Sequence, residues 1–185
     1  MTDSHLQELL AKCRKFDSVS QQKVYRHFYN YCMTICYRYA QNTEEAREIM
    51  NDGFVKVFTK LDKYTQGTSF KAWMSRIMVN TAIDHYRRKQ SRPQTIDIIH
   101  ASHLQSSPDV VQRMTAKELM DLVQKLPPSY RIAFNLHVVE GYTHPQIAEK
   151  LGISEGTSKS NLAKARLKLQ TMLETLNIKK SNYGS

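Results

Sequence analysis

One segment restricts the fold of this chain more than any other: residues 143–169, THPQIAEKLGISEGTSKSNLAKARLKL. Thr143 and Gln146 have the spacing of a capping box, with a proline in the permissive first turn of the helix that follows. Gly152 comes after a short apolar stripe, where a left-handed residue can end that helix, and Ser154 can cap a second one. The inner face of this second helix is expected to consist of four residues: Leu162, Ala165, Leu169 and Met172. Two short helices joined by a glycine turn predict a helix-turn-helix.

The outer face of the second predicted helix is cationic. Residues 157–170 contain no acid, and the outward positions are Lys159, Ser160, Ala163, Lys164, Arg166 and Lys168. Small side chains allow a helix to enter a DNA groove, and cations meet phosphates and base acceptors there. The alternative is a charged helix face that only contacts solvent. We nevertheless expect DNA binding, because the helix cap, the glycine turn and a helix with cations but no acids occur together. Ser158 departs from the pattern, because a branched apolar residue usually occupies that position of the motif.

The rest of the sequence is helical in period and divides into two domains. The chain contains only 6 glycines, and no segment shows sustained alternation of apolar and polar residues. Pro93 and Pro108 lie in a stretch without a strong period, which is typical of a linker. We therefore expect an all-α fold with an N-terminal helical domain at residues 1–90, a flexible linker at 91–108 and the helix-turn-helix domain at 109–185.

Composition indicates an anionic partner and a reducing compartment. The formal net charge of +10 favours binding to a polyanion such as nucleic acid. Three cysteines, Cys13, Cys32 and Cys36, cannot form a complete disulfide set, and no further ligand pair is spaced for a metal, so we expect them to pack as small apolar groups and we predict no metal and no cofactor. The charged N-terminus and the lack of an apolar run of about 20 residues predict a cytoplasmic protein without membrane insertion.

A second cationic helix is predicted to begin at residues 68–70 and to run to about residue 89. Residues 71–92 contain six cations and one acid, Asp84. By helical spacing, Asn80, Asp84, Arg87 and Arg88 share an outer face, whereas the inner face is expected to consist of Phe70, Trp73, Met74 and Ile77. This face carries positive charge and also an amide that can form hydrogen bonds with a base. The combination predicts a second nucleic-acid surface.

Together these segments resemble the extracytoplasmic-function group of bacterial sigma factors, over nearly all of residues 17–176. The helix by which these factors hold the clamp helices of RNA polymerase is similar to AREIMNDGFVKVFTKLDKY. The segment that opens and reads the proximal promoter element is similar to SFKAWMSRIMVNTAIDHYRR. The domain that reads the distal element is similar to LVQKLPPSYRIAFNLHVVEGYTHPQIAEKL followed by SEGTSKSNLAKARLKL. The resemblance implies a promoter-specificity subunit whose partners are core RNA polymerase and promoter DNA, both duplex and melted, and in many members an anti-sigma factor.

The resemblance also implies roles for individual residues. Contacts with the polymerase clamp would come from Glu48, Asn51, Asp52 and Val55. Proximal-element contacts would come from Tyr64, Ser69, Asn80, Asp84, Arg87, Arg88 and Lys89, with the loop 64–69 and Asn80 forming a pocket for a flipped base. In the distal element, Lys159, Ser160, Ala163 and Lys164 would face bases, and Thr143, Ser154, Thr157 and Arg166 would support phosphate contacts. Family members often have arginine where Asn161 stands here, which points to an altered site.

Two other classes of function remain as alternatives. A free-standing helix-turn-helix regulator would use the first domain to bind a ligand or to dimerise. A nucleic-acid enzyme would need clustered carboxylates or a histidine-based metal set near the basic face. The seven histidines are scattered and Asp84 has no second carboxylate on its predicted face, so we expect that the protein is not an enzyme.

Overall fold

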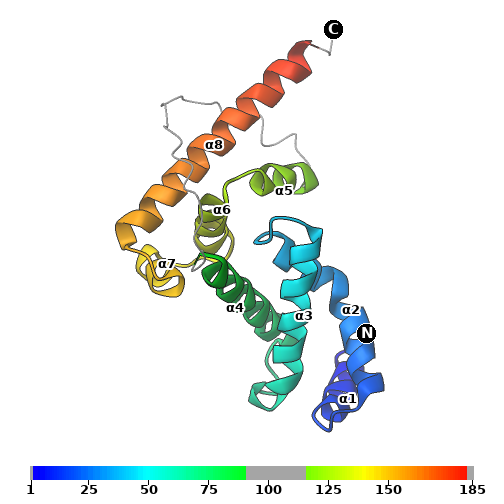
Figure 1. Ribbon diagram of the computed structural model, residues 1–185. Helices are drawn as coiled ribbons and strands as arrows, with labels where there is room; N and C mark the ends of the chain where they lie inside the picture. Colours follow the sequence, from blue (N-terminus) through cyan, green and yellow to red (C-terminus); the bar gives the residue numbers. More distant parts are fainter. Residues whose placement is uncertain (1, 91–115, 183–185) are drawn as a thin grey trace. The chain divides into compact units, whose positions relative to one another are not determined.

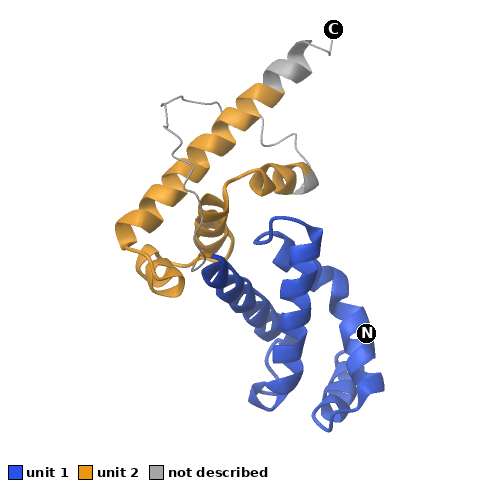
Figure 2. Cartoon of the chain, in the orientation of Figure 1, with its two compact units in different colours: residues 1–89 blue, residues 90–185 orange. Residues whose placement is uncertain are grey.

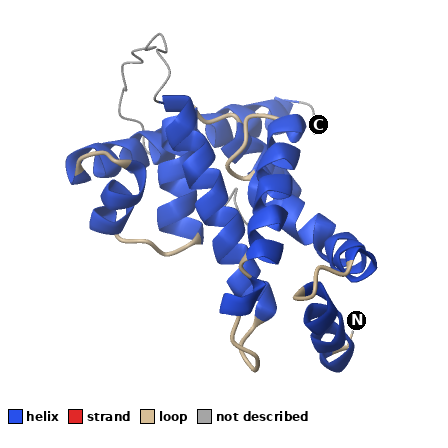
Figure 3. Cartoon of the chain, turned by 60° about the horizontal axis from the view of Figure 1, so that its bottom comes forward, coloured by secondary structure: helices blue, strands red, loops and turns tan. Residues whose placement is uncertain are grey.

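A computed structural model describes residues 2–90 and 116–182, and within these ranges it contains helices, turns and loops but no strand (Figures 1 and 3). The all-α prediction is confirmed. The chain forms two compact units, residues 1–89 and 90–185 (Figure 2), which are described separately below. The predicted linker, 91–108, and residues 109–115 of the predicted helix-turn-helix domain lie outside the described residues.

Four α-helices and one short 3-10 turn make up the first unit: α1 (Asp3–Cys13), α2 (Ser18–Tyr37), α3 (Thr43–Thr59), η1 (Leu61–Lys63) and α4 (Phe70–Gln90). Side-chain caps set the starts of the first three helices, because Thr2, Asp17 and Asn42 each accept a hydrogen bond from a backbone N–H in the first turn. The α2 helix packs against both α1 and α3. Local capping therefore decides where these helices begin, and apolar packing decides how they are joined.

The buried face of α4 is wider than the sequence indicated. Phe70 and Met74 are buried as expected, but Trp73 and Ile77 are only half-buried. The remaining buried positions of α4 are Met78, Val79, Thr81, Ala82 and Ile83. Contacts with two other helices explain this width, because Met74 and Met78 lie 3.7 and 3.9 Å from Cys32 and Cys36 on α2, and Met78 also packs against α3. The packing against α3 is close at Gly53, where an added Cβ would lie 2.3 Å from the Met78 sulfur.

The second unit contains α5 (Ala116–Gln124), α6 (Pro128–Phe134), the π-helical turn η3 (Asn135–Val139), α7 (His144–Leu151) and α8 (Glu155–Asn182). The long helix α8 packs against α5, α6 and α7. The stretch from Pro128 to Val139 is not one regular helix, because the structure changes from α to π geometry at Asn135. The unit thus presents α7 and the first turns of α8 on a support made by α5 and α6.

Two absences hold for the part of the chain that the structure describes. No helix there is long and apolar enough to cross a membrane, and no three side chains of metal-ligating type come together. Cys13, Cys32 and Cys36 are buried as free thiols. Burial raises the pKa of Cys13 to about 11 and that of Cys32 and Cys36 to about 12, so these thiols stay protonated at neutral pH and serve as packing groups.

Candidate nucleic-acid interfaces

The helix-turn-helix forms with the boundaries that its sequence predicts. The Thr143 hydroxyl accepts from the Gln146 N–H, and the Gln146 side chain accepts from the Thr143 N–H at 2.9 Å, which completes the capping box. Gly152 adopts φ 68°, a left-handed conformation, and its N–H donates to the Ala148 carbonyl at 2.9 Å. These local bonds end α7 and reverse the chain into α8.

Ser154 and Thr157 organise the first turn of α8. The Thr157 N–H donates to the Ser154 hydroxyl at 3.0 Å, and the two hydroxyl groups lie 2.8 Å apart. Both residues were expected to support phosphate contacts, and the structure places both at the exposed N-terminus of α8, where backbone N–H groups favour an anion. In the structure, these two residues cap the helix that carries the cations.

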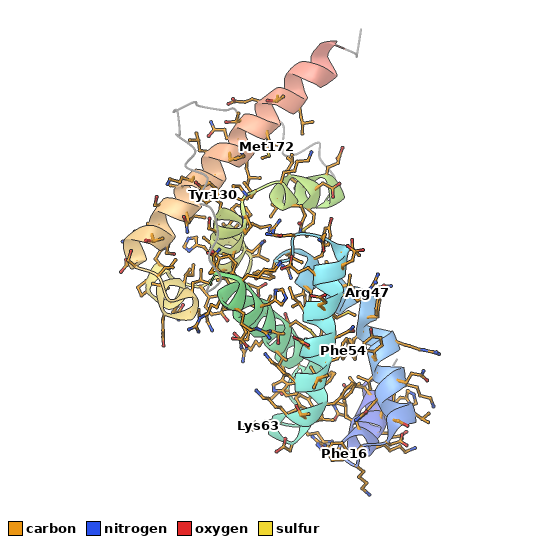
Figure 4. The ribbon with its side chains drawn as sticks, in the orientation of Figure 1. Phe16, Arg47, Phe54, Lys63, Tyr130 and Met172 are labelled. Atoms are coloured by element: carbon orange, nitrogen blue, oxygen red, sulfur yellow. The ribbon has the colours of Figure 1, made fainter. Side chains whose placement is uncertain are left out.

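The first turns of α8 carry the outward side chains expected there, but the prediction holds less well further along the helix. Lys159, Ser160, Ala163, Lys164 and Arg166 are all exposed, and Leu162 and Ala165 are buried against the rest of the unit, whereas Lys168, Leu169 and Met172 are all half-buried. Glu155, just before the acid-free stretch, forms an ion pair with Lys159 at 2.6 Å. The Lys164 ammonium lies 5.9 Å from the ring centroid of Tyr130 on α6 (Figure 4). Two of the expected base-facing cations therefore already have a partner within the unit: Lys159 has the carboxylate of Glu155 and Lys164 has the ring of Tyr130. The Lys159–Glu155 pair is exposed, so a DNA phosphate can replace Glu155 at little cost.

Ser158, the residue that departs from the usual pattern, is fully buried and bonded to a histidine. Its hydroxyl lies 3.0 Å from Nδ1 of His144, the first residue of α7. The His144 ring stacks on His137, with centroids 4.7 Å apart, and Nδ1 of His137 lies 2.9 Å from the Tyr142 carbonyl, to which it must donate. Burial, together with His137 and Lys159, holds the pKa of His144 below its ordinary value. A polar cluster thus replaces the expected apolar contact between α7 and α8.

On α4, the residues predicted to share an outer face do so. Asn80, Asp84, Arg87 and Arg88 are exposed, and Lys89 is half-buried. This face meets the side of α3: Asp84 pairs with Lys56 at 2.9 Å, and Arg88 lies 3.6 Å from Asp52. From the sequence we predicted two separate surfaces on these two helices. In the structure the surfaces adjoin, because a basic and an acidic side chain of α3 pair with an acidic and a basic side chain of α4.

Glu45, in the first turn of α3, links the connection before that helix to the end of α4, a role that the sequence did not indicate. Its carboxylate accepts from the Gln41 N–H at 2.7 Å, pairs with the Lys89 ammonium at 2.7 Å and lies 3.2 Å from Nδ1 of His85. Burial tends to raise the pKa of Glu45, but Lys89, the Gln41 N–H and His85 outweigh it and hold the pKa below its usual value. Lys89 is therefore engaged in joining α4 to the start of α3, which leaves it less suited to the phosphate contact we expected.

The residues proposed for polymerase binding form one exposed stripe along α3. Glu48, Asn51, Asp52 and Val55 all face solvent, and Asn51 accepts a hydrogen bond from the Tyr25 hydroxyl at 3.1 Å. Val55 is 62% exposed and lies on the same stripe as two carboxylates and an amide.

The loop before α4, which we predicted to form a base pocket with Asn80, is held together by Tyr64. Tyr64 is only 3% exposed: its ring packs against Phe70 and Trp73, and its hydroxyl donates to the Thr68 carbonyl at 2.6 Å. Ser69 caps α4 by accepting from the Ala72 N–H at 3.2 Å. At 1.5 Å of rise per residue, Ser69 and Asn80 lie about 16 Å apart along the helix axis. Tyr64 therefore supports the loop, and the pocket with Asn80 stays a prediction.

Comparison with known proteins places both units in the same family. The family described as Sigma-70 region 2 matches residues 24–92, and the family described as Sigma-70, region 4 matches residues 116–169. Together the two matches cover about two thirds of the chain. They contain the α3 stripe, the α4 face and the helix-turn-helix.

Individual relatives are distant but numerous. RNA polymerase sigma factor SigZ of Bacillus subtilis is 29% identical, with 71% of this chain and 75% of that protein covered. ECF RNA polymerase sigma factor SigE of Mycolicibacterium smegmatis is 27% identical over 75% of this chain, and the match spans 56% of that longer protein. RNA polymerase sigma-H factor of Pseudomonas aeruginosa is 21% identical, with 95% and 97% covered. Among solved structures, the sigma factor RpoE of Bartonella quintana, in complex with the anti-sigma factor NepR, matches at 19% identity with a TM-score of 0.47, over 83% of this chain and 96% of that one.

Proposed function

Since the chain belongs to the extracytoplasmic-function group of the sigma-70 family, we propose that it is a promoter-specificity subunit that directs core RNA polymerase to initiate transcription. In this role it binds polymerase and DNA and performs no catalysis of its own. It acts in the cytoplasm, where its polymerase is found. An inhibitory partner of the anti-sigma type remains a prediction from the family resemblance.

One observation carries the proposal: two separately folded units each expose a cationic helical face, on α4 and on α8. A duplex-binding regulator needs one such face per subunit, whereas a promoter is read at two separated elements. We assign the proximal element to residues 1–90 and the distal element to residues 109–185, with 91–108 as the connection. Neither face alone is expected to give strong specific binding, because charge contacts with phosphates are sequence-independent and weaken as salt rises.

The α3 stripe suits the contact with the polymerase clamp. Val55 supplies apolar area that has no cover within the unit, and Glu48, Asn51 and Asp52 surround it with hydrogen-bonding groups. Protein interfaces commonly combine a buried apolar centre with a polar rim, and removing Val55 from water on binding would be favourable. This supports a role for the stripe in holding core polymerase.

The α4 face is suited to the proximal element because its cations are held loosely. Arg88 and Asp52 are both largely exposed, and exposed ion pairs typically contribute about 0–1 kcal/mol, so a DNA phosphate can replace Asp52 at little cost. Arg87 is exposed on the same face, and Asn80 adds an amide that can donate and accept at once. Lys89, by contrast, is held by the buried carboxylate of Glu45, so we assign it to stability rather than to DNA.

For the distal element, the first turns of α8 supply the reading surface. Lys159, Ser160, Ala163 and Lys164 face bases, and Arg166, Thr143 and the capped start of the helix at Ser154 and Thr157 hold the backbone. Ala163 and Ser160 keep the helix narrow enough to enter a major groove. The contacts of Lys159 with Glu155 and of Lys164 near Tyr130 exchange for DNA groups on binding.

Run-off transcription with purified core RNA polymerase, on a library of genomic fragments, tests the proposal. Core polymerase plus the chain should give discrete transcripts that core polymerase alone does not. As a matched control, a chain with Val55→Asp and Asp52→Lys should lose core binding and all transcripts while its thermal unfolding stays close to that of the parent. If the chain yields no core-dependent transcript but still binds duplex DNA tightly and specifically, it is a free-standing regulator and the proposal is wrong.

A further inference from the structure

The turn between α1 and α2 holds an aromatic side chain in an unusual position. Phe16 has φ 61°, and it is the only non-glycine residue with a positive φ in the part of the chain that the structure describes. Bulky residues rarely adopt this conformation, which glycine or asparagine would adopt with less strain. The ring receives no packing in return, since the residue is 74% exposed. A strained and exposed aromatic residue is the kind of outlier that marks a binding site.

The backbone on both sides of Phe16 is fixed. The Phe16 N–H donates to the Cys13 carbonyl at 2.9 Å, and the Asp17 N–H donates to the Lys12 carbonyl at 3.3 Å. Cys13 is fully buried, and the Asp17 carboxylate caps α2 by accepting from the Ser20 N–H at 2.8 Å. Two helix ends thus force the conformation, so the ring is presented to solvent in advance of any partner.

This turn adjoins the loop before α4. The Arg14 guanidinium donates to the Tyr64 carbonyl at 3.3 Å, and the two connections lie at the same end of the first unit, as the labels of Phe16 and Lys63 indicate (Figure 4). The proposed function assigns the proximal element to this unit and its α4 face, and the loop leads directly into α4 at Phe70, so a melted strand that follows α4 to its first turn would come to Phe16. The exposed groups around it are mainly cationic, with Lys12, Arg14 and Lys15 in sequence before it.

We propose that Phe16 is a stacking platform for an unpaired base of the melted promoter strand, with Arg14 and Lys15 holding the neighbouring phosphates. The inference rests on the proposed function. Aromatic rings interleaved with cations are the usual means of binding single-stranded DNA, and stacking accepts any base. A protein partner would need a larger apolar area, but the only exposed large apolar neighbour within the described residues is Val19.

Open-complex lifetime measures this contact in the holoenzyme, reconstituted from core polymerase and the full chain. Asparagine tolerates the left-handed conformation, so Phe16→Asn removes the ring and keeps the turn. We expect Phe16→Asn to melt at a temperature no lower than the parent, yet to lose its open complex at least about fivefold faster after a heparin challenge. Phe16→Tyr should restore the lifetime, and Val19→Ala should leave it unchanged.

A fluorescent base shows whether the contact is with DNA. The templates are already mismatched across the melted segment, and 2-aminopurine replaces one base of the non-template strand at a time. At one position, holoenzyme with the parent chain or with Phe16→Tyr should quench the 2-aminopurine fluorescence. At the same position, holoenzyme with Phe16→Asn should leave the fluorescence unquenched. Unchanged lifetime and fluorescence in Phe16→Asn would overturn the inference alone, provided that the parent initiates transcription. Weaker binding of Phe16→Asn to core polymerase would show that Phe16 contacts protein and would also overturn it. A parent chain that gives no core-dependent transcript would instead refute the proposed function.

Discussion

Replacing Gly53 with alanine adds a methyl group on α3 directly against the Met78 side chain of α4. The new Cβ would lie 2.3 Å from the Met78 sulfur, and Met78 is fully buried, so its side chain has no solvent to move into. Overpacking of this kind typically costs about 1–3 kcal/mol, while the higher helix propensity of alanine returns up to about 1 kcal/mol. We expect a net loss of about 1–2 kcal/mol, or a melting temperature lower by about 5–15 °C for a unit of this size.

Thermal and urea unfolding, followed by circular dichroism, measure this effect. Gly156→Ala is the matched control: Gly156 is exposed in the first turn of α8, its nearest neighbour would lie at 3.7 Å, and the change should stabilise slightly or leave stability unchanged. Shortening the facing side chain, in Gly53→Ala combined with Met78→Val, should recover part of the loss. If the unfolding midpoint of Gly53→Ala is equal to or higher than that of the parent, Met78 does not pack closely against Gly53 and the reasoning is wrong.

Three further predictions concern Lys164, Asn80 and His144. Lys164→Ala should weaken the distal-element footprint by about 1–3 kcal/mol if Lys164 reads a guanine edge, whereas equal weakening on all sequences would show a phosphate contact, and an unchanged footprint would remove it from the groove. Asn80→Ala should leave core binding and the distal footprint intact but lower permanganate reactivity of the melted segment on duplex promoters, with a smaller defect on pre-opened templates; melting equal to the parent's would contradict the assignment. Because the pKa of His144 lies below its ordinary value of 6.5, the unfolded chain binds more protons than the folded one, so stability is present above about pH 6.5 and falls as the pH drops further. His144→Gln should remove this part of the pH dependence in thermal unfolding, and an unchanged slope would show that the His144 contact with Ser158 does not depend on the neutral ring.

Features set by neighbouring residues were predictable from the sequence. The capping box at Thr143, the left-handed Gly152 and the cap at Ser154 each involve groups within four residues, so their bonds follow from the order of residue types. The outer face of α4 also followed from spacing alone. The all-α fold and the family resemblance rest on such local patterns, and both are confirmed.

Features that depend on packing between helices were not predictable in this way. Glu45 and Lys89 are 44 positions apart, and only the close packing of α3 on α4 brings them together. The burial of Tyr64 was not predictable either, because it depends on the packing of its ring against Phe70 and Trp73 at the start of α4. Ser158 was recognised as a departure, but its partner His144 became apparent only when the two helices were placed side by side.

The central claim is that this chain reads promoters only as part of RNA polymerase, and a footprint titration with and without core polymerase tests it most directly. Using a promoter fragment selected by run-off transcription, the free chain should bind with a dissociation constant of about micromolar or weaker, with a steep dependence on salt. With core polymerase, protection should appear over two separated elements at nanomolar concentrations, because fixing the two units at one spacing converts the second contact into an intramolecular one. Nanomolar, sequence-specific protection by the free chain, with no gain on adding core polymerase, would contradict the account.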